Sequence, residues 1–127
     1  MKKIAIIIGG SSGIGFATAT ELLKSNAKVL IVGSKAEKLE TAVKNLKKLG
    51  DVDSFKSDIT NTVELIKLVE HIEKFRRVDY LVNASGIFLP KSFLDHSLKD
   101  FNSYLDLNKG FFFITQAVAR KMKSQNN

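Results

Sequence analysis

Three of the four glycines that follow the first apolar run of the chain have a spacing that points to phosphate chemistry. Residues Ile4–Ile8 are all apolar, as in a strand buried on both faces. The next stretch combines glycines with hydroxyl side chains: Gly9, Ser11, Ser12, Gly13 and Gly15. A helix that starts directly after a parallel strand presents unpaired N–H groups and the positive end of its dipole, which suit a phosphate. Because glycine lets the backbone turn sharply and approach such a group, the stretch predicts a pyrophosphate-binding turn.

Two other interpretations of this turn are a P-loop and a tight strand-to-helix turn that holds no ligand. A P-loop requires lysine and then serine or threonine after the last glycine. Here Gly15 is followed by Phe16 and Ala17, so a P-loop is excluded. The turn without a ligand stays open on this segment alone.

The elements that must position the turn alternate between strand and helix. Buried apolar runs predict strands at residues 4–8 and 28–32, and a shorter third strand and a fourth are expected at 52–56 and 78–82. Apolar residues at helical spacing predict helices at 14–24, 35–49, 62–75, 98–105 and 111–122. Alternation of this kind indicates an α/β fold with a parallel sheet and right-handed crossovers. The whole chain, 1–127, is expected to form one domain.

Local patterns also predict helix ends and inward faces. Thr60 and Ser97 are expected to cap helices at their N-termini, and Gly50 to follow the end of the second helix. In the first helix we expect Ile14, Ala17 and Leu22 to face inward. In the third helix we expect Val63, Ile66, Val69 and Ile72 to do so, and in the last helix Phe112, Thr115, Val118, Ala119 and Met122.

Composition narrows the possible partners. The net charge of +7 comes from 20 basic and 13 acidic residues, but the lysines are scattered, so no nucleic-acid partner is expected. With no cysteine and two distant histidines, no metal site is expected. The apolar run at the N-terminus is shorter than that of a signal peptide, and no stretch has the length of a membrane span. A cytoplasmic protein without a membrane partner is therefore expected.

The glycine turn resembles the cofactor loop of the short-chain dehydrogenase/reductase family, Thr-Gly-x-x-x-Gly-Ile-Gly. Gly9, Gly13, Ile14 and Gly15 match that pattern, and Ile8 stands where the family usually has threonine. Further along, Ser57-Asp58-Ile59-Thr60 resembles the family segment whose aspartate contacts the adenine ring. Residues 82–86 resemble its Asn-Asn-Ala-Gly segment: Asn83 and Gly86 match, whereas Ala84 and Ser85 replace asparagine and alanine.

A fourth match is Asn108, at the position of the family's helix asparagine. The family usually has one more residue between that asparagine and the next glycine, and a deletion there would rotate the rest of the helix by about 100°. The resemblance covers residues 4–127. It implies a Rossmann-like, doubly wound parallel sheet, here with four strand–helix units in the strand order 3-2-1-4.

Residues after the second strand bear on which nicotinamide cofactor is preferred. An NAD-binding site would place a carboxylate there for the ribose 2′-hydroxyl. This chain has Gly33, Ser34 and Lys35, which favour a 2′-phosphate and hence NADP(H) over NAD(H). A solvent-facing Lys35 is the alternative. The basic residue that the family often carries in the glycine loop is replaced by Ser12.

The resemblance implies hydride transfer between the cofactor and a carbonyl or alcohol. In the family this needs a serine, a tyrosine with a lysine four residues later, and the helix asparagine. Tyr80 is followed at that distance by Ala84, and Tyr104 by Asn108, so Asn108 is the sole catalytic counterpart. We expect a cofactor-binding domain that is not catalytic alone. The alternatives are an oxidoreductase completed by another chain and a non-enzymatic interaction module.

The fourth strand carries a further expectation. In the resembling fold that strand is interior, and this chain ends where the fifth strand would begin. The edge from Val78 to Asn83 is therefore expected to recruit a second copy or a partner chain.

Overall fold

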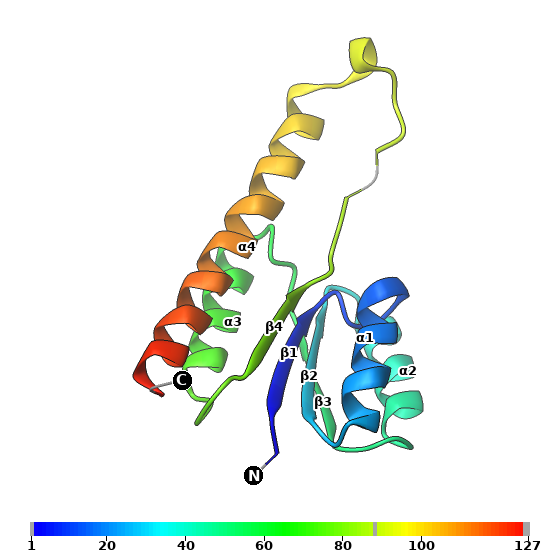
Figure 1. Cartoon of the computed structure of the whole chain (residues 1–127). Helices are drawn as coiled ribbons and strands as arrows, with labels where there is room; N and C mark the ends of the chain where they lie inside the picture. The colour runs from blue at the N-terminus through cyan, green and yellow to red at the C-terminus, as the bar shows by residue number, and fades with distance from the viewer. Residues whose placement is uncertain (1, 88, 126–127) are drawn as a thin grey trace.

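The computed structural model describes residues 2–87 and 89–125. Four parallel strands form one sheet: β1 (Ile4–Ile8), β2 (Lys28–Gly33), β3 (Val52–Lys56) and β4 (Tyr80–Asn83). Their order is β3-β2-β1-β4 (Figure 1), so the chain moves outward from β1 to β3 and then crosses to the far side of β1. The predicted α/β class and strand order are confirmed.

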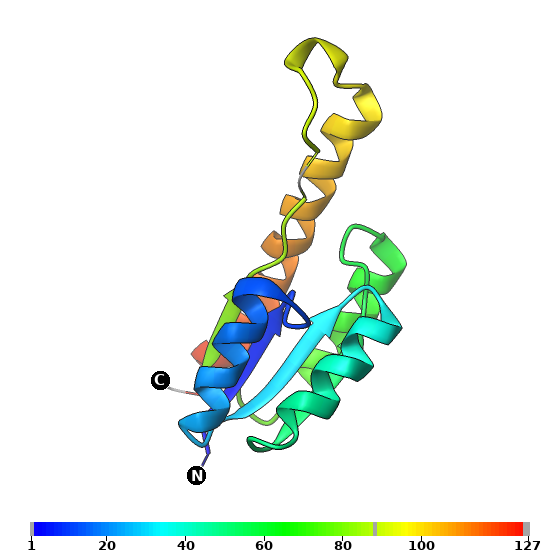
Figure 2. The ribbon, with the colours of Figure 1, turned by 90° about the vertical axis from the view of Figure 1, so that its right-hand side faces the viewer.

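Helices cover both faces of the sheet (Figures 1 and 2). On one face lie α1 (Gly13–Lys24) and α2 (Ala36–Leu46), and on the other lie α3 (Thr62–Glu73) and α4 (Leu98–Ser124). A short 3-10 turn, η1 (Phe93–Asp95), precedes α4. Among the described residues, no helix combines the length and apolar character needed to cross a bilayer.

Side chains of the central strands alternate between two apolar clusters, because successive residues of a strand point to opposite faces. Ile6 and Ile8 pack toward α3 and α4, whereas Ala5 and Ile7 pack toward α1 and α2. All four are at most 1% exposed. This double burial explains why the strand at 4–8 is apolar at every position.

The inward faces of two helices differ from those expected. In α1 the buried residues are Gly15, Ala19 and Leu23, and Ile14 is 79% exposed. In α3 they are Leu65, Leu68 and Ile72, whereas Val63 and Ile66 are exposed. Both helices carry apolar residues on more than one side, so spacing alone left two possible faces. Contact with the sheet and with α4 selects one.

Helix ends also required correction. The N-cap of α3 is Asn61, whose Oδ1 accepts a hydrogen bond from Glu64 N at 3.1 Å, and not Thr60. The Thr60 hydroxyl donates to Asp58 Oδ1 at 2.6 Å instead. The second helix ends at Leu46, before the expected 49, so Gly50 does not follow its last turn.

The helices expected at 98–105 and 111–122 are one continuous helix, α4. Ser97 caps it as predicted: Ser97 Oγ accepts from Asp100 N at 3.1 Å, and Asp100 Oδ2 accepts from Ser97 N at 3.0 Å. Together with η1, its first turns project beyond the sheet (Figure 1). Phe112, expected to face inward, is 62% exposed, because Gly110, Ile114 and Val118 form the buried side.

The last turn of α4 holds the segment that leads into β4. Gln125 Oε1 accepts from Val78 N at 2.7 Å, and Gln125 Nε2 donates to Val78 O at 3.2 Å. Next along the chain, Asp79 Oδ2 accepts from Ile4 N at 2.8 Å and Asp79 forms an ion pair with Arg77. The strand proper begins at Tyr80, two residues later than expected.

Candidate functional site

The loop from β1 to α1 has the sharp turn that its glycines predicted. Gly9 and Gly13 have φ angles of +83° and +56°, in the left-handed region that favours glycine. A Cβ atom on Gly15 would lie 2.0 Å from the carbonyl oxygen of Gly9, so that position also requires glycine. Ser12 is the N-cap of α1, yet its side chain makes no capping hydrogen bond. Its hydroxyl and the first N–H groups of α1 are thus available to a ligand.

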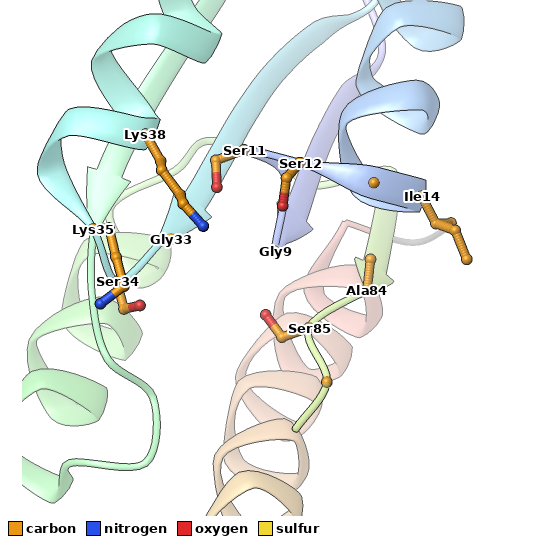
Figure 3. Close-up of a pocket in the computed structure, with 12 residues that line it drawn as sticks. Gly9, Ser11, Ser12, Ile14, Gly33, Ser34, Lys35, Lys38, Ala84 and Ser85 are labelled. Carbon is orange, nitrogen blue, oxygen red and sulfur yellow. The ribbon is translucent and has the colours of Figure 1, made fainter. Parts of the chain in front are cut away.

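This loop forms one wall of a cleft at the carboxyl ends of the strands (Figure 3). The cleft has a volume of about 380 Å³. Its lining comes from the glycine loop, the end of β2, the start of α2 and the segment after β4: Gly9, Ser11, Ser12, Gly13, Ile14, Gly33, Ser34, Lys35, Lys38, Ala84, Ser85 and Gly86. Two lysines are its charged lining residues.

A second cavity of about 160 Å³ adjoins the cleft and shares Gly33, Ser34, Ser85 and Gly86 with it. Asp58 and Ile59 line this cavity. The Asp58 carboxylate is oriented by Thr60, whose backbone N–H and hydroxyl donate to Asp58 Oδ1 at 3.0 and 2.6 Å. The loop after β3 therefore presents one fixed carboxylate and one apolar side chain beside the cleft.

Two glycines leave open space where a side chain would otherwise be. A Cβ atom built on Gly13 or on Gly86 meets no protein atom within 4 Å. Gly9 differs, because its Cβ would lie 2.7 Å from both the backbone N and the Oγ of Ser85. The segment after β4 thus packs directly on the glycine loop, and the two together leave a backbone-lined space that fits a phosphate-bearing ligand.

A family model for short chain dehydrogenases matches residues 3–127. The chain belongs to the short-chain dehydrogenase family. It is 35% identical over 127 residues to an uncharacterized oxidoreductase of Staphylococcus haemolyticus, and 33% identical over 129 residues to a 3alpha-hydroxysteroid dehydrogenase of Mediterraneibacter gnavus. These alignments include 98% of this chain but 54% and 52% of the relatives, so the chain spans about half their length.

A solved structure shows the same fold. The short-chain dehydrogenase from Sphingobium yanoikuyae, in complex with NADPH, superposes with a TM-score of 0.90 at 20% identity. The match covers 97% of this chain and 49% of that one. The four-stranded sheet described above therefore corresponds to half of a short-chain dehydrogenase.

Most of the residues predicted for cofactor binding in this short-chain dehydrogenase domain lie together. Those that line the cleft are Gly9, Ser11, Ser12, Gly13, Ile14, Gly33, Ser34, Lys35, Ala84 and Gly86, and those that line the adjoining cavity include Asp58 and Ile59. Gly15 lies behind the loop against Gly9. Asn83 lines neither space, and its Nδ2 donates to Thr115 Oγ1 of α4 at 3.3 Å.

Asn108 lies apart from these residues. It is exposed and borders a shallow apolar depression on the outer side of α4, with Phe112 among its neighbours. The preceding residue, Leu107, lines the cavity beside Ile59. The buried Gly110 sets this orientation, and the helix has one residue fewer between asparagine and glycine than the family usually has. The catalytic role of Asn108 stays a prediction.

Sequence reasoning missed two residues of the cleft, Lys38 and Ser85. Lys38 follows Lys35 by three residues, and helical spacing puts residues three apart on neighbouring positions of one face. That spacing was the signal for including Lys38. Ser85 stood in a recognised motif but was set aside as a departure from its pattern.

Neither tyrosine lines the cleft. Tyr80 borders a different depression, with Lys2 and Lys3, at the end of the sheet where β1 begins. Tyr104 lies on α4, with its ring stacked on His96 at a centroid distance of 6.3 Å.

Proposed function

We propose that this chain is an NADP(H)-binding domain of the short-chain dehydrogenase type. The observation that carries the proposal is the cleft in which an uncapped α1 N-terminus faces the space left open by Gly13 and Gly86. The pyrophosphate would lie on the glycine loop, where N–H groups and the Ser12 hydroxyl are free to donate. The adenine would lie toward Asp58 and Ile59.

The proposed preference for NADP(H) rests on charge. Lys35 and Lys38 line the cleft, and no carboxylate that would repel a 2′-phosphate is among its lining residues. The structurally similar enzyme from Sphingobium yanoikuyae was solved with NADPH, which is consistent with this preference.

When bound, NADPH supplies a hydride for reduction of a carbonyl. The residues of this chain bind and orient the cofactor, but they offer no group to move the proton. An unperturbed tyrosine has a pKa near 10 and is a poor base at neutral pH without a nearby cation. Tyr80 and Tyr104 both lie away from the cleft. We therefore propose cofactor binding without catalysis by the 127 residues alone.

A second proposal concerns the free side of β4, which is the last strand in the sheet order. Tyr80 on this strand is 44% exposed, and α4 beside it exposes Phe112 and Phe113 at 62% and 43%. An unpaired strand edge next to apolar surface favours association. We propose that a second copy of the chain, or a partner chain, covers this region.

A cytoplasmic location remains a prediction from the sequence.

The test is a titration of the purified chain with NADPH and with NADH, followed by the fluorescence of the dihydronicotinamide. We expect saturable binding with NADPH tighter than NADH, and no carbonyl-dependent oxidation of NADPH. A chain that is folded by circular dichroism but binds neither dinucleotide contradicts the proposed function.

A further inference from the structure

The first turn of α2 places Lys38 between two hollows of the surface. One is the cleft of about 380 Å³ described above, and the other is a groove of about 540 Å³ between α1 and α2. Both are lined by Lys38 and by Ser11, Ser12 and Gly13 of the glycine loop. Lys38 therefore faces the glycine loop from the opposite wall.

The Ser11 hydroxyl belongs to the glycine-loop wall and lies near the end of β2. A Cβ atom on Gly33, the last residue of β2, would be 3.3 Å from Ser11 Oγ. The hydroxyl thus lies directly over the end of β2. In Figure 3 the Lys38 side chain extends from α2 toward Ser11, whereas Lys35 lies beside Ser34 at the outer rim. A side chain at position 33 would crowd the Ser11 hydroxyl, and glycine avoids this.

The part of the cleft around Lys35 and Lys38 carries positive charge that no lining carboxylate balances. Lys35 and Lys38 are the charged residues that line the cleft, and neither forms an ion pair within the described ranges 2–87 and 89–125. The carboxylate of Glu37 lines the groove, not the cleft. An ammonium and a hydroxyl in a cleft with no carboxylate among its lining residues suit a phosphate dianion, because both donate hydrogen bonds and one carries positive charge.

We infer that Lys38, together with the Ser11 hydroxyl, binds the ribose 2′-phosphate of the cofactor, and that Lys35 contributes less. The inference rests on the proposed function, because the end of β2 is where the adenosine ribose of a bound dinucleotide would lie. Lys38 is then a specificity-determining residue. Its ammonium interacts with a group that NADPH has and NADH lacks, so it separates the affinities of the two dinucleotides.

The experiment compares three alanine variants of the full chain. Lys38→Ala removes the proposed contact, Lys35→Ala removes the other cation of the cleft, and Lys44→Ala removes a charge from α2 outside the cleft. Dissociation constants for NADPH and NADH are measured in one buffer of fixed ionic strength, because exposed charges are screened by salt. Adenosine 2′,5′-bisphosphate and ADP, used as competitors, isolate the adenosine end.

We expect Lys38→Ala to weaken NADPH binding by roughly tenfold, as for loss of one partly exposed charge-assisted hydrogen bond, with less than about a twofold change for NADH. Lys35→Ala is expected to have a clearly smaller effect on NADPH, and Lys44→Ala none. Lys38→Arg, which keeps the charge, is expected to retain the preference for NADPH. The bisphosphate competitor is expected to lose affinity for Lys38→Ala, and ADP to keep it.

An unchanged NADPH-to-NADH ratio in Lys38→Ala, or an equal loss in Lys35→Ala, overturns the inference and leaves the proposed function standing. Absence of dinucleotide binding by the unmodified, folded chain overturns both. The two failures are distinguishable because the second is seen before any substitution is made.

Discussion

A Cβ atom on Gly110 would lie 2.7 Å from the carbonyl oxygen of Ile59. The backbone of α4 at Gly110 therefore packs directly against the backbone of the loop after β3, with no room for a side chain between them. Gly110 is buried at this contact. One turn earlier, Leu107 borders the cavity beside Ile59. This contact places Gly110 on the inner side of α4, whereas Asn108, two residues earlier, is exposed on the outer side.

The close contact makes Gly110 intolerant of a side chain. We expect Gly110→Ala to lower the free energy of unfolding by about 1–3 kcal/mol, because the helix or the loop must shift to relieve the overlap. Urea denaturation followed by circular dichroism measures this. Gly50→Ala is the matched control, since its Cβ would meet Leu23 at an ordinary 3.4 Å. Equal stability of the two variants would show that α4 does not depend on this contact.

Substitutions at two other glycines separate folding from cofactor binding. Gly86→Val introduces a side chain into space free of protein atoms, so we expect the variant to fold and to lose dinucleotide binding. Gly15→Ala places Cβ 2.0 Å from Gly9 O, so we expect loss of both stability and binding. Thermal unfolding and NADPH titration of each variant give the two readouts. Normal NADPH affinity in Gly86→Val would place the cofactor elsewhere.

The N-terminus of α4 is sensitive to acid through Asp100. The hydrogen bond from Lys91 Nζ, at 2.8 Å, and the backbone N–H of Ser97 lower the pKa of Asp100 from 3.8 to about 2. Because the pKa is lower in the folded state, ionised Asp100 stabilises the fold above pH 3.8, and this contribution is lost as the pH falls toward 2.

Titration of the Asp100 carboxyl by nuclear magnetic resonance measures this pKa directly. We expect Lys91→Ala to raise it toward the ordinary value, because Lys91 is the largest of the lowering contributions. We also expect Asp100→Asn to reduce the loss of stability between pH 4 and 2. An Asp100 that titrates near 3.8 in the unmodified chain would contradict the capping arrangement.

Gln125 satisfies both backbone groups of Val78, a residue with no exposed surface. We expect Gln125→Ala to cost about 1–3 kcal/mol of stability, because it leaves a buried N–H and a buried carbonyl without partners. Ser124→Ala is the control: it removes an exposed hydrogen bond to Lys121 O, and we expect a change within about 0.5 kcal/mol. Denaturant midpoints for both variants decide the comparison.

The free edge of β4 predicts self-association. At tens of micromolar, light scattering of the unmodified chain is expected to show a dimer or a larger species. Tyr80→Lys places a charge on the edge and should shift the population toward monomer, with cofactor binding retained. Phe112→Ser tests the exposed side of α4 separately. A monodisperse monomer of the unmodified chain would refute the association.

The sequence predicted those features that depend on local pattern. The strand at 4–8 is apolar throughout and the strand at 28–32 is apolar after Lys28, because both faces of the sheet are covered, so their positions were clear. The strand at 52–56 was also predicted, although Asp53, Ser54 and Lys56 make it more polar. The glycine turn was equally clear, since left-handed φ angles and close packing at Gly15 leave few alternatives to glycine. The Ser97 cap was predicted because it depends on residues four positions apart or fewer.

Features that depend on distant contacts were predicted less well. The outward orientation of Phe112 follows from the contact between Gly110 and Ile59, which are far apart in the sequence. In α3, apolar residues occupy two sides of the helix. Packing against α4 buries Leu65 and Leu68 and leaves Val63 and Ile66 exposed. Lys38 lines the cleft from the first turn of α2, which begins at Ala36, one residue later than expected.

The pairing of Gln125 with Val78 bears on how the protein folds and opens. That contact spans 47 residues, whereas the contact from Asp79 to Ile4 that docks β4 beside β1 spans 75. Closing the longer loop costs more conformational entropy, so we expect the unit from β4 to α4 to form its own contacts before it docks. We expect amide hydrogens of β4 and α4 to exchange with solvent together and sooner than those of β1 and β2. On this expectation the chain has two cooperative parts, and the cleft proposed for the cofactor lies on the boundary between them.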